Sequence, residues 1–187
     1  FCDNTLWGLV NFRGDVINYY VHQGYEVYLV APEKEDRQMV LPVPEGVTFI
    51  PVFMGRTSTS PLNDLRYFIT LCKIYAKVKP QYCFHYTIKP NIYGSIAAYL
   101  NGAECSTAMI AGLGYVFNNR SISALVARFL YKIGLLFTDY LFVLNEGNRD
   151  VILRKNLCSE KKVRLLPGGE GINTRKYPLY DNSPVDP

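Results

Sequence analysis

The sequence lacks the short motifs that would assign it to several common enzyme classes. It has neither the G-x-G-x-x-G fingerprint of dinucleotide-binding proteins nor a P-loop. The G-x-S-x-G elbow of serine hydrolases is also missing. Asp and Glu residues are scattered over predicted loops and helix caps, so paired-carboxylate catalysis has no convincing location.

Histidine and cysteine are too few, or too irregularly spaced, for a metal site or a disulfide framework. The two histidines, His22 and His85, do not have metal-ligand spacing, which argues against a structural zinc. The five cysteines are odd in number and include no C-x-x-C pair. Three of them lie in apolar runs, where a free cysteine behaves as a small hydrophobe. A reducing compartment, the cytoplasm, is therefore predicted.

Long apolar or basic runs are missing as well. Residues 121–144 form the most apolar segment, but Arg128, Lys132 and Asp139 interrupt it, which excludes a spanning helix. No Lys/Arg run of nucleic-acid-binding length occurs, so no nucleic-acid partner is predicted. No signal peptide is visible. The sequence opens on residues typical of the tail of a first strand, so we expect the native start to lie a few residues upstream.

What is present is the composition of a globular domain. The 187 residues are 49% apolar and 19% charged, which suits one ordinary domain with a sizeable core. The net charge is +4 and the isoelectric point is near 8.7. This mildly basic balance favours phosphorylated ligands or an anionic membrane surface.

Strand and helix patterns alternate along the chain, which predicts an α/β fold with a doubly wound, mostly parallel sheet. Predicted strands cover residues 25–31, 47–53, 81–84, 108–111, 140–144 and 163–166. A first helix is predicted to begin at residue 13. Four further helices are predicted at residues 60–79, 92–100, 121–136 and 148–157. Residues 1–173 are predicted to form one Rossmann-like domain, and residues 174–187, with three prolines, a linker or tail.

A polar cluster follows the strand predicted at residues 81–84. His85, Thr87, Lys89 and Asn91 lie where this strand ends and a helix begins. Ligands bind at this edge of open α/β sheets because backbone N–H groups and a positive helix end converge there. The pattern alone leaves two roles open for His85: a functional one, as a base or as a residue that orients a sugar hydroxyl, and a structural one, as a residue with satisfied hydrogen bonds.

Two further loops are candidate ligand sites. In Asn11-Phe12-Arg13-Gly14, a cation and a glycine at a predicted helix start can hold a phosphate, although a tight turn with an exposed arginine fits equally well. Gly112 and Gly114 follow the strand predicted at residues 108–111. They would let a ligand approach the backbone, or they supply a turn that needs positive φ.

Four segments occur in the same order in one known family. They are Asn11-Phe12-Arg13, Thr87-Ile88-Lys89-Pro90-Asn91-Ile92-Tyr93-Gly94, Gly112-Leu113-Gly114-Tyr115-Val116-Phe117 and Leu166-Pro167-Gly168-Gly169. With them, nearly the whole chain resembles the N-terminal domain of bacterial family 4 glycosyltransferases of the GT-B fold. The resemblance is to the branch that builds lipid-linked capsule, O-antigen and glycan precursors.

This resemblance implies a retaining transfer of a sugar from a UDP-linked nucleotide sugar to a polyprenyl-diphosphate-linked glycan, at the inner face of the cytoplasmic membrane. It implies no metal or other resident cofactor, because helix ends and basic side chains stabilise the leaving diphosphate. Arg13 and Gly14 match the loop that borders the donor phosphates. The residues expected at the acceptor side of the cleft are Asn11, Phe12, His85, Thr87, Lys89, Asn91, Gly112, Gly114 and Tyr115. We expect Lys89→Ala to lower transfer with little loss of stability.

The sequence also departs from the family pattern. The donor-binding domain, with its carboxylate pair, is not in this sequence, and no histidine follows the strand at residues 108–111. The resemblance therefore assigns no catalytic residue and predicts that this chain alone is inactive. Two alternatives stay open: a Rossmann enzyme that binds NAD or a nucleotide sugar, and a non-catalytic module that docks on a membrane through the basic helix at residues 62–79.

Overall fold

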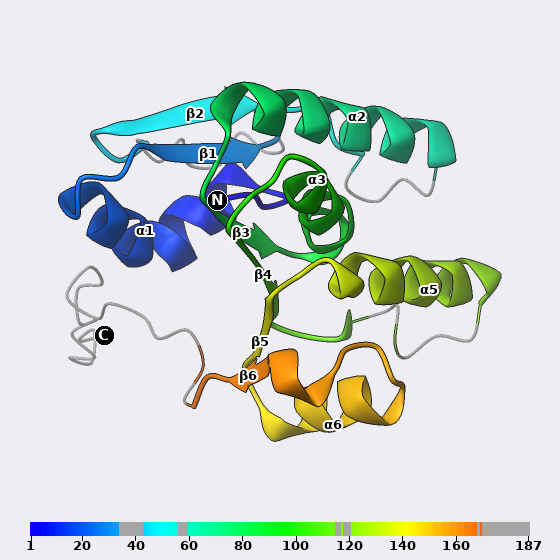
Figure 1. The fold of residues 1–187 in the computed structure, drawn as a ribbon. Helices are drawn as coiled ribbons and strands as arrows, with labels where there is room; N and C mark the ends of the chain where they lie inside the picture. The colour runs from blue at the N-terminus through cyan, green and yellow to red at the C-terminus, as the bar shows by residue number, and fades with distance from the viewer. Residues whose placement is uncertain (34–42, 56–59, 115–116, 118–120, 168, 170–187) are drawn as a thin grey trace, which may run out of the picture.

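The computed structural model describes residues 1–33, 43–55, 60–114, 117, 121–167 and 169 (Figure 1). The strands are β1 (Val27–Ala31), β2 (Val47–Pro51), β3 (Tyr82–Tyr86), β4 (Cys105–Ile110), β5 (Tyr140–Val143) and β6 (Val163–Leu165). The α-helices are α1 (Leu6–His22), α2 (Pro61–Val78), α3 (Ser95–Leu100), α5 (Ile122–Leu136) and α6 (Glu146–Arg154). A π-helical turn, η1 (Pro90–Gly94), and a 3-10 turn, η2 (Glu160–Lys162), complete the described elements.

The described strands form a parallel sheet that is joined at its centre by the N-terminal segment. β1 pairs with β2, and β3 to β6 pair in chain order, all in parallel. Cys2 bridges the two groups, since it forms parallel bridges to Val30 and to His85. The strand order is therefore β2-β1-Cys2-β3-β4-β5-β6, and the winding reverses direction at Cys2. The predicted doubly wound parallel sheet is confirmed.

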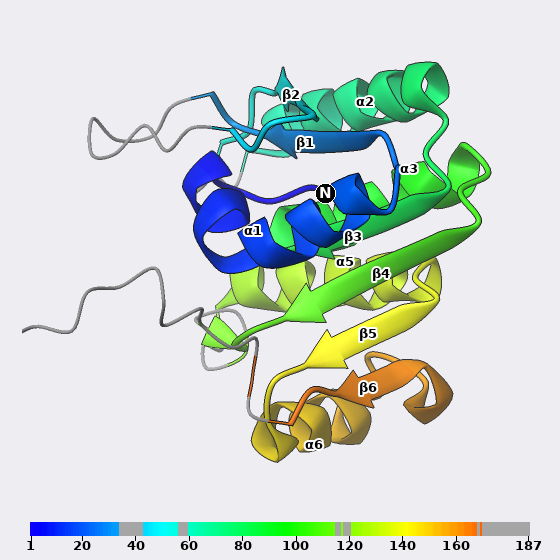
Figure 2. The ribbon, with the colours of Figure 1, turned by 90° about the vertical axis from the view of Figure 1, so that its left-hand side faces the viewer.

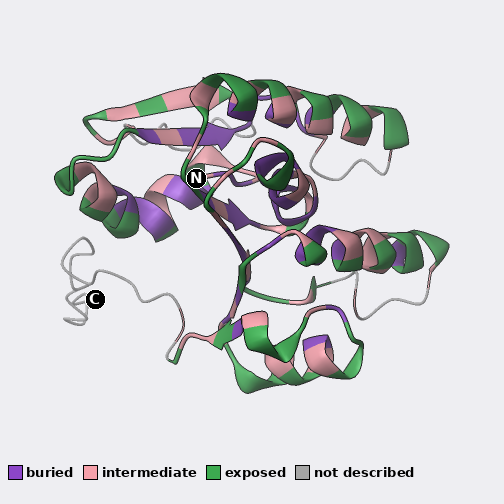
Figure 3. Ribbon diagram, viewed as in Figure 1, coloured by how far each residue is buried: buried purple, intermediate pink, exposed green. Residues whose placement is uncertain are grey.

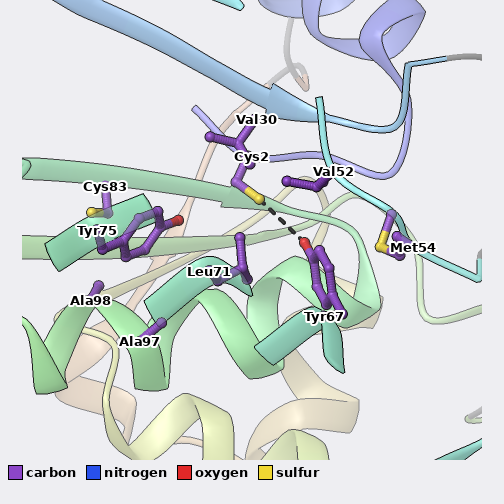
Figure 4. Close-up of a cluster of buried hydrophobic side chains, with 10 residues drawn as sticks. All are labelled: Cys2, Val30, Val52, Met54, Tyr67, Leu71, Tyr75, Cys83, Ala97 and Ala98. Carbon is purple, nitrogen blue, oxygen red and sulfur yellow. Dashed lines mark hydrogen bonds between the residues drawn. The ribbon is translucent and has the colours of Figure 1, made fainter. Parts of the chain in front are cut away.

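Helices cover both faces of this sheet. Figures 1 and 2 show α1 on one face and α3 and α5 on the other, with α2 in the same layer as α3. The α1 side buries Leu9 and Ile17 against β1. On the other side, α2 and α3 enclose the cluster in Figure 4, where the Cys2 thiol and the Tyr67 hydroxyl lie 3.4 Å apart. In Figure 3 the buried residues accordingly concentrate on the strands and on the inward sides of the helices.

The first helix begins earlier than the sequence pattern predicted. Thr5 caps α1, with its Oγ1 accepting the Gly8 N–H at 2.9 Å. The buried face repeats every four residues at Leu9, Arg13 and Ile17. The prediction that residues 3–12 form a strand end and a loop is therefore wrong beyond the cap. The apolar spacing outweighs the loop tendency of the asparagine and glycine in this stretch.

Two glycines allow the segment after β3 to pack closely. A Cβ at Gly94 would overlap the His85 ring, and a Cβ at Gly134 of α5 would lie 2.6 Å from the Ile92 Cα in η1. π-helical turns such as η1 are frequently found at functional sites. In α3, Tyr99 and Leu100 are 63% and 62% exposed, whereas Ala97 and Ala98 are buried.

None of the described helices is both long and apolar enough to cross a membrane. The predicted linker, residues 174–187, lies outside the described residues.

Candidate functional site

A crevice of about 340 Å³ opens where the strands end, at the point where the winding of the sheet reverses. Its lining comes from strand ends and from one helix on each face: Asn4 after Cys2, Met54 after β2, residues 86–89 from β3, residues 109–112 from β4, Arg13 of α1 and Tyr131 of α5. Open α/β sheets bind ligands at such a switch point.

A second cavity, of about 380 Å³, lies at the opposite edge, between the starts of β1 and β3. None of the predicted site residues lines it. Strands begin at that edge and helices end there, so helix carbonyl groups rather than N–H groups face it. We therefore place the candidate site in the crevice at the strand ends.

Arg13 reaches this crevice through its side chain. The residue is 7% exposed, and its guanidinium carbon lies 4.4 Å from the centre of the Tyr86 ring. This cation–π contact holds a positive charge beside the crevice. The backbone cradle predicted at Arg13-Gly14 is wrong, because both residues lie in the interior of α1 and their N–H groups belong to the helical ladder. Proximity of Arg13 to donor phosphates stays a prediction.

Thr87 lies at the tip of β3 in a conformation that threonine rarely adopts. Its φ is +68°, in the left-handed region, and its hydroxyl donates to the Tyr86 carbonyl at 2.5 Å. A β-branched residue in this region costs about 1–3 kcal/mol, and such residues cluster at ligand sites. Gly112, across the crevice, is exposed, and the position that a Cβ would take there is open space. The structure thus brings Thr87 and Gly112 to the same crevice, and their contact with an acceptor stays a prediction.

Lys89 also lines the crevice, but its ammonium is engaged. Its Nζ lies 2.6 Å from Asp64 Oδ1 and 2.5 Å from the Gly55 carbonyl oxygen. The Tyr93 hydroxyl donates to the other carboxylate oxygen of Asp64 at 3.1 Å. Burial and the adjacent Asp64 raise the pKa of Tyr93, so it remains a donor. Lys89 therefore ties the crevice edge to α2.

Asn91 is fully buried rather than exposed in the crevice. Its amide nitrogen donates to the Met109 carbonyl and lies 2.8 Å from the Tyr131 hydroxyl. It joins η1 to β4 and α5, and thereby holds Tyr131, which does line the crevice. The position of Asn91 supports a positioning role.

His85 lies inside β3, one strand residue before the tip, and faces the core. The residue is 1% exposed, its Nε2 lies 3.0 Å from the Tyr75 hydroxyl, and its Nδ1 is 3.4 Å from the Ser106 hydroxyl. Burial lowers the pKa of His85 to about 3, so the ring is neutral at physiological pH. Of the two roles left open by the sequence, the surroundings fit the structural one.

Asn11, Phe12 and Gly114 lie outside the crevice lining. Asn11 donates to the Trp7 carbonyl within α1, and Phe12 is exposed on the same helix. Gly114 adopts φ +54°, the turn conformation that glycine allows. Tyr115 falls outside the described residues.

Several crevice residues were not predicted from the sequence. They are Asn4, Met54, Tyr86 and Tyr131, together with Asp64, which holds Lys89. The rule that ligands bind where parallel strands end could have found Asn4. Asn4 follows the central segment at Cys2 just as Thr87 follows β3. The local sequence marks Asp64 only as an acid in the first turn of a helix, where a negative charge suits the dipole. Nothing local in the sequence marks Tyr131, which comes from the middle of α5.

Chemically, the crevice combines two cations, Arg13 and the Asp64-bound Lys89, with hydroxyl and amide groups and apolar walls. This lining suits a ligand that carries both hydroxyl groups and negative charge. Among the described residues, no three His, Cys, Asp or Glu side chains gather into a metal-binding group.

A family of known proteins matches the part of the sequence that forms most of this sheet and crevice. Residues 7–145, which include α1, the β3 tip and β4, match the family described as glycosyl transferase 4-like. The chain belongs to this glycosyltransferase family. The matched region contains every described side chain of the crevice except Asn4.

One curated relative of this family 4-like chain is an Escherichia coli enzyme, the UDP-Gal:alpha-D-GlcNAc-diphosphoundecaprenol alpha-1,3-galactosyltransferase. The two sequences are 24% identical over 121 residues, which is 65% of this chain and 31% of that enzyme. The chain therefore spans about a third of the length of this relative.

Two solved structures share the fold of this family 4-like domain. The UDP-GlcNAc 2-epimerase of Methanocaldococcus jannaschii aligns with a TM-score of 0.61 and 16% identity, over 88% of this chain and 44% of its own. The sucrose-phosphate synthase of Thermosynechococcus elongatus aligns with a TM-score of 0.60 and 14% identity, over 83% and 41%. At these identities the likeness concerns the fold alone, which is a Rossmann-like domain of the GT-B type.

Proposed function

We propose that residues 1–173 are the acceptor-side domain of a larger retaining glycosyltransferase. In this proposal, residues 174–187 lead to a donor-binding domain that completes the cleft, and the chain without that domain does not transfer sugar. The family match over residues 7–145, centred on the crevice at the strand ends, is the observation that carries the proposal.

The side chains of the crevice support this division of roles. Arg13 lies over the Tyr86 ring, where its charge can attract a diphosphate group without closing the crevice. Thr87 and Asn4 offer hydrogen bonds to sugar hydroxyls from two strand ends. A volume near 340 Å³ lies at the small end of the range for ligand pockets, which is about 300–1,000 Å³. This size fits one part of a substrate whose remainder contacts a second wall.

The substrates are proposed from the chemistry named for the relative. The E. coli enzyme is named for a UDP-sugar donor and a sugar-diphosphoundecaprenol acceptor. We infer the same two classes here: a UDP-hexose donor and a glycan on polyprenyl diphosphate. The reaction then serves capsule or O-antigen synthesis from the cytoplasm, at the inner face of the cytoplasmic membrane.

A transfer assay on the complete enzyme tests this proposal. UDP-galactose, UDP-glucose and their N-acetylamino forms are each incubated with GlcNAc-diphosphate on a short polyprenyl chain, and the lipid product is identified by mass spectrometry. We expect one donor to give a product with retained anomeric configuration. No product from any UDP-hexose would contradict the proposal.

A crevice-filling variant links this activity to the site. Gly112→Trp places a large side chain in open space at the crevice, so kcat/KM should fall about tenfold or more with an unchanged Tm. Asp150→Trp, at an exposed position on α6, is the matched control and should transfer normally. If both variants transfer at the normal rate, this crevice is not the site.

The NAD-binding alternative is separated by a binding measurement. Saturation-transfer NMR of the chain with NAD should show no contact, because the central strand is followed by Asn4-Thr5-Leu6 and not by a glycine-rich turn. Clear NAD binding would favour the alternative over the transferase.

A further inference from the structure

Two helices on the same face of the sheet expose apolar side chains at helical spacing. On α5, Ile122, Leu125 and Phe129 are 82%, 61% and 63% exposed. On α2, Leu62 is 79% exposed, and Leu65 continues the same exposed stripe. Single exposed apolar residues are ordinary, but a continuous stripe on a helix usually marks an interaction surface.

Cations follow these apolar residues on both helices. On α2, Lys73 lies four residues after the exposed Ile69, a rise of about 6 Å along the axis. On α5, Lys132 lies three residues after Phe129, a rise of about 4.5 Å. On each helix, therefore, a lysine follows an exposed apolar side chain by about one turn.

Acidic side chains are almost absent from these helices. α5 contains no Asp or Glu, and the single acid of α2, Asp64, is bound to Lys89 and Tyr93. The resulting charge is positive along both exposed stripes. This combination suits a surface that offers both negative charge and apolar depth.

The placement of the two helices adds a geometric argument. α2 and α5 both begin at the edge where the strands end, and the two helices run in the same direction in Figures 1 and 2. The crevice opens at this same edge. On the opposite face, α1 also exposes Val16 and Tyr19, but its one arginine is buried.

We propose that these two stripes form a docking surface for an anionic lipid bilayer. The lipid-docking surface comprises Leu62, Leu65, Ile69, Lys73 and Lys77 of α2 and Ile122, Leu125, Val126, Phe129 and Lys132 of α5. The apolar residues enter the boundary between headgroups and acyl chains, and the lysines lie at the level of the anionic headgroups. A second copy of the chain is a poorer occupant, because a two-fold contact would offer the lysines no acidic partner on this surface.

This inference deepens the proposed function and rests on it for one point only, the lipid-linked acceptor. Docking through α2 and α5 places the crevice edge against the membrane, where a polyprenyl-diphosphate group lies at the headgroup level. It also extends the basic helix expected from the sequence with a second, more apolar helix, α5.

Vesicle co-sedimentation of the 187-residue chain tests the surface. We expect binding to phosphatidylglycerol-containing vesicles that weakens as NaCl is raised, and little binding to pure phosphatidylcholine. Leu125→Ser with Phe129→Ser should weaken binding roughly tenfold or more, and Lys73→Glu with Lys132→Glu should do the same. Circular dichroism melting confirms that the variants are folded.

The matched control is Val16→Ser with Tyr19→Ser, which removes two exposed apolar side chains from α1 on the other face. It should bind vesicles like the unmodified chain. The proposal is overturned if the unmodified chain does not bind anionic vesicles, or if both surface variants bind as well as the control. It is also overturned if sedimentation velocity shows a dimer that Leu125→Ser with Phe129→Ser dissociates.

This test is independent of the transfer reaction, because it contains neither donor nor acceptor. Vesicle binding without transfer by the complete enzyme would keep the docking surface and reject the proposed function. Transfer without vesicle binding would keep the proposed function and reject the docking surface.

Discussion

Replacing Lys89 by methionine removes a charge that connects the crevice edge to α2. Methionine keeps most of the apolar stem, so the loss falls on the ammonium contacts with Asp64 at 2.6 Å and with the Gly55 carbonyl at 2.5 Å. The Asp64 carboxylate would then keep only the Tyr93 hydroxyl among the partners described here. A partly buried carboxylate that loses its cation is destabilising.

The size of the effect follows from how far the pair is buried. An exposed ion pair contributes about 0.2–1 kcal/mol, whereas breaking a buried pair costs about 3–5 kcal/mol. The side chains of Lys89 and Asp64 are 15% and 19% exposed, which places this pair between the two limits. We expect Lys89→Met to lower the free energy of unfolding by about 2 kcal/mol, or Tm by about 4–8 °C. This revises the expectation that truncating Lys89 leaves stability nearly unchanged.

A double-mutant cycle measures the pair itself. Urea unfolding followed by circular dichroism gives the free energies of the unmodified chain, Lys89→Met, Asp64→Asn and the double variant. The coupling energy should be about 1–2 kcal/mol, because Asp64→Asn removes the charge that Lys89→Met leaves unpaired. A coupling below about 0.3 kcal/mol, the level expected of independent sites, would refute the reasoning.

Two other perturbations test the interior behind the crevice. Because burial holds the pKa of His85 at about 3, below its ordinary 6.5, the unfolded state binds more protons between these values and stability falls with falling pH. His85→Gln should therefore reduce the loss of unfolding free energy between about pH 7 and pH 5. The His85 contribution is up to about 1.4 kcal/mol per pH unit. Gly134→Ala should destabilise the chain by about 1–3 kcal/mol, because the added Cβ would lie 2.6 Å from the Ile92 Cα. Gly147→Ala, where the nearest atom is 3.4 Å away, should be neutral or stabilising; equal effects of the two substitutions would contradict the close-packing argument.

The sequence predicted the sheet better than it predicted the site. The type of each element follows from local periodicity, so the strands from β1 to β6 were found within a few residues of their bounds. The rule that ligands bind where strands end placed Thr87, Lys89 and Gly112 at one edge, where they line the crevice, and their contact with a ligand stays a prediction. It failed for His85 and Asn91, because a position near a strand tip does not say whether a side chain faces the crevice or the core.

The sequence by itself determined that this chain folds as a parallel α/β domain and which loops gather at one edge. Those properties depend on apolar spacing, prolines, glycines and caps within a few residues of each other. Only the tertiary structure decided that Arg13 lies inside a helix over Tyr86, and that Lys89 is held by Asp64, 25 residues away in sequence. The physical reason is that partners from other elements set the burial and the charge environment of a side chain. A local sequence pattern does not say which distant residues will become those partners.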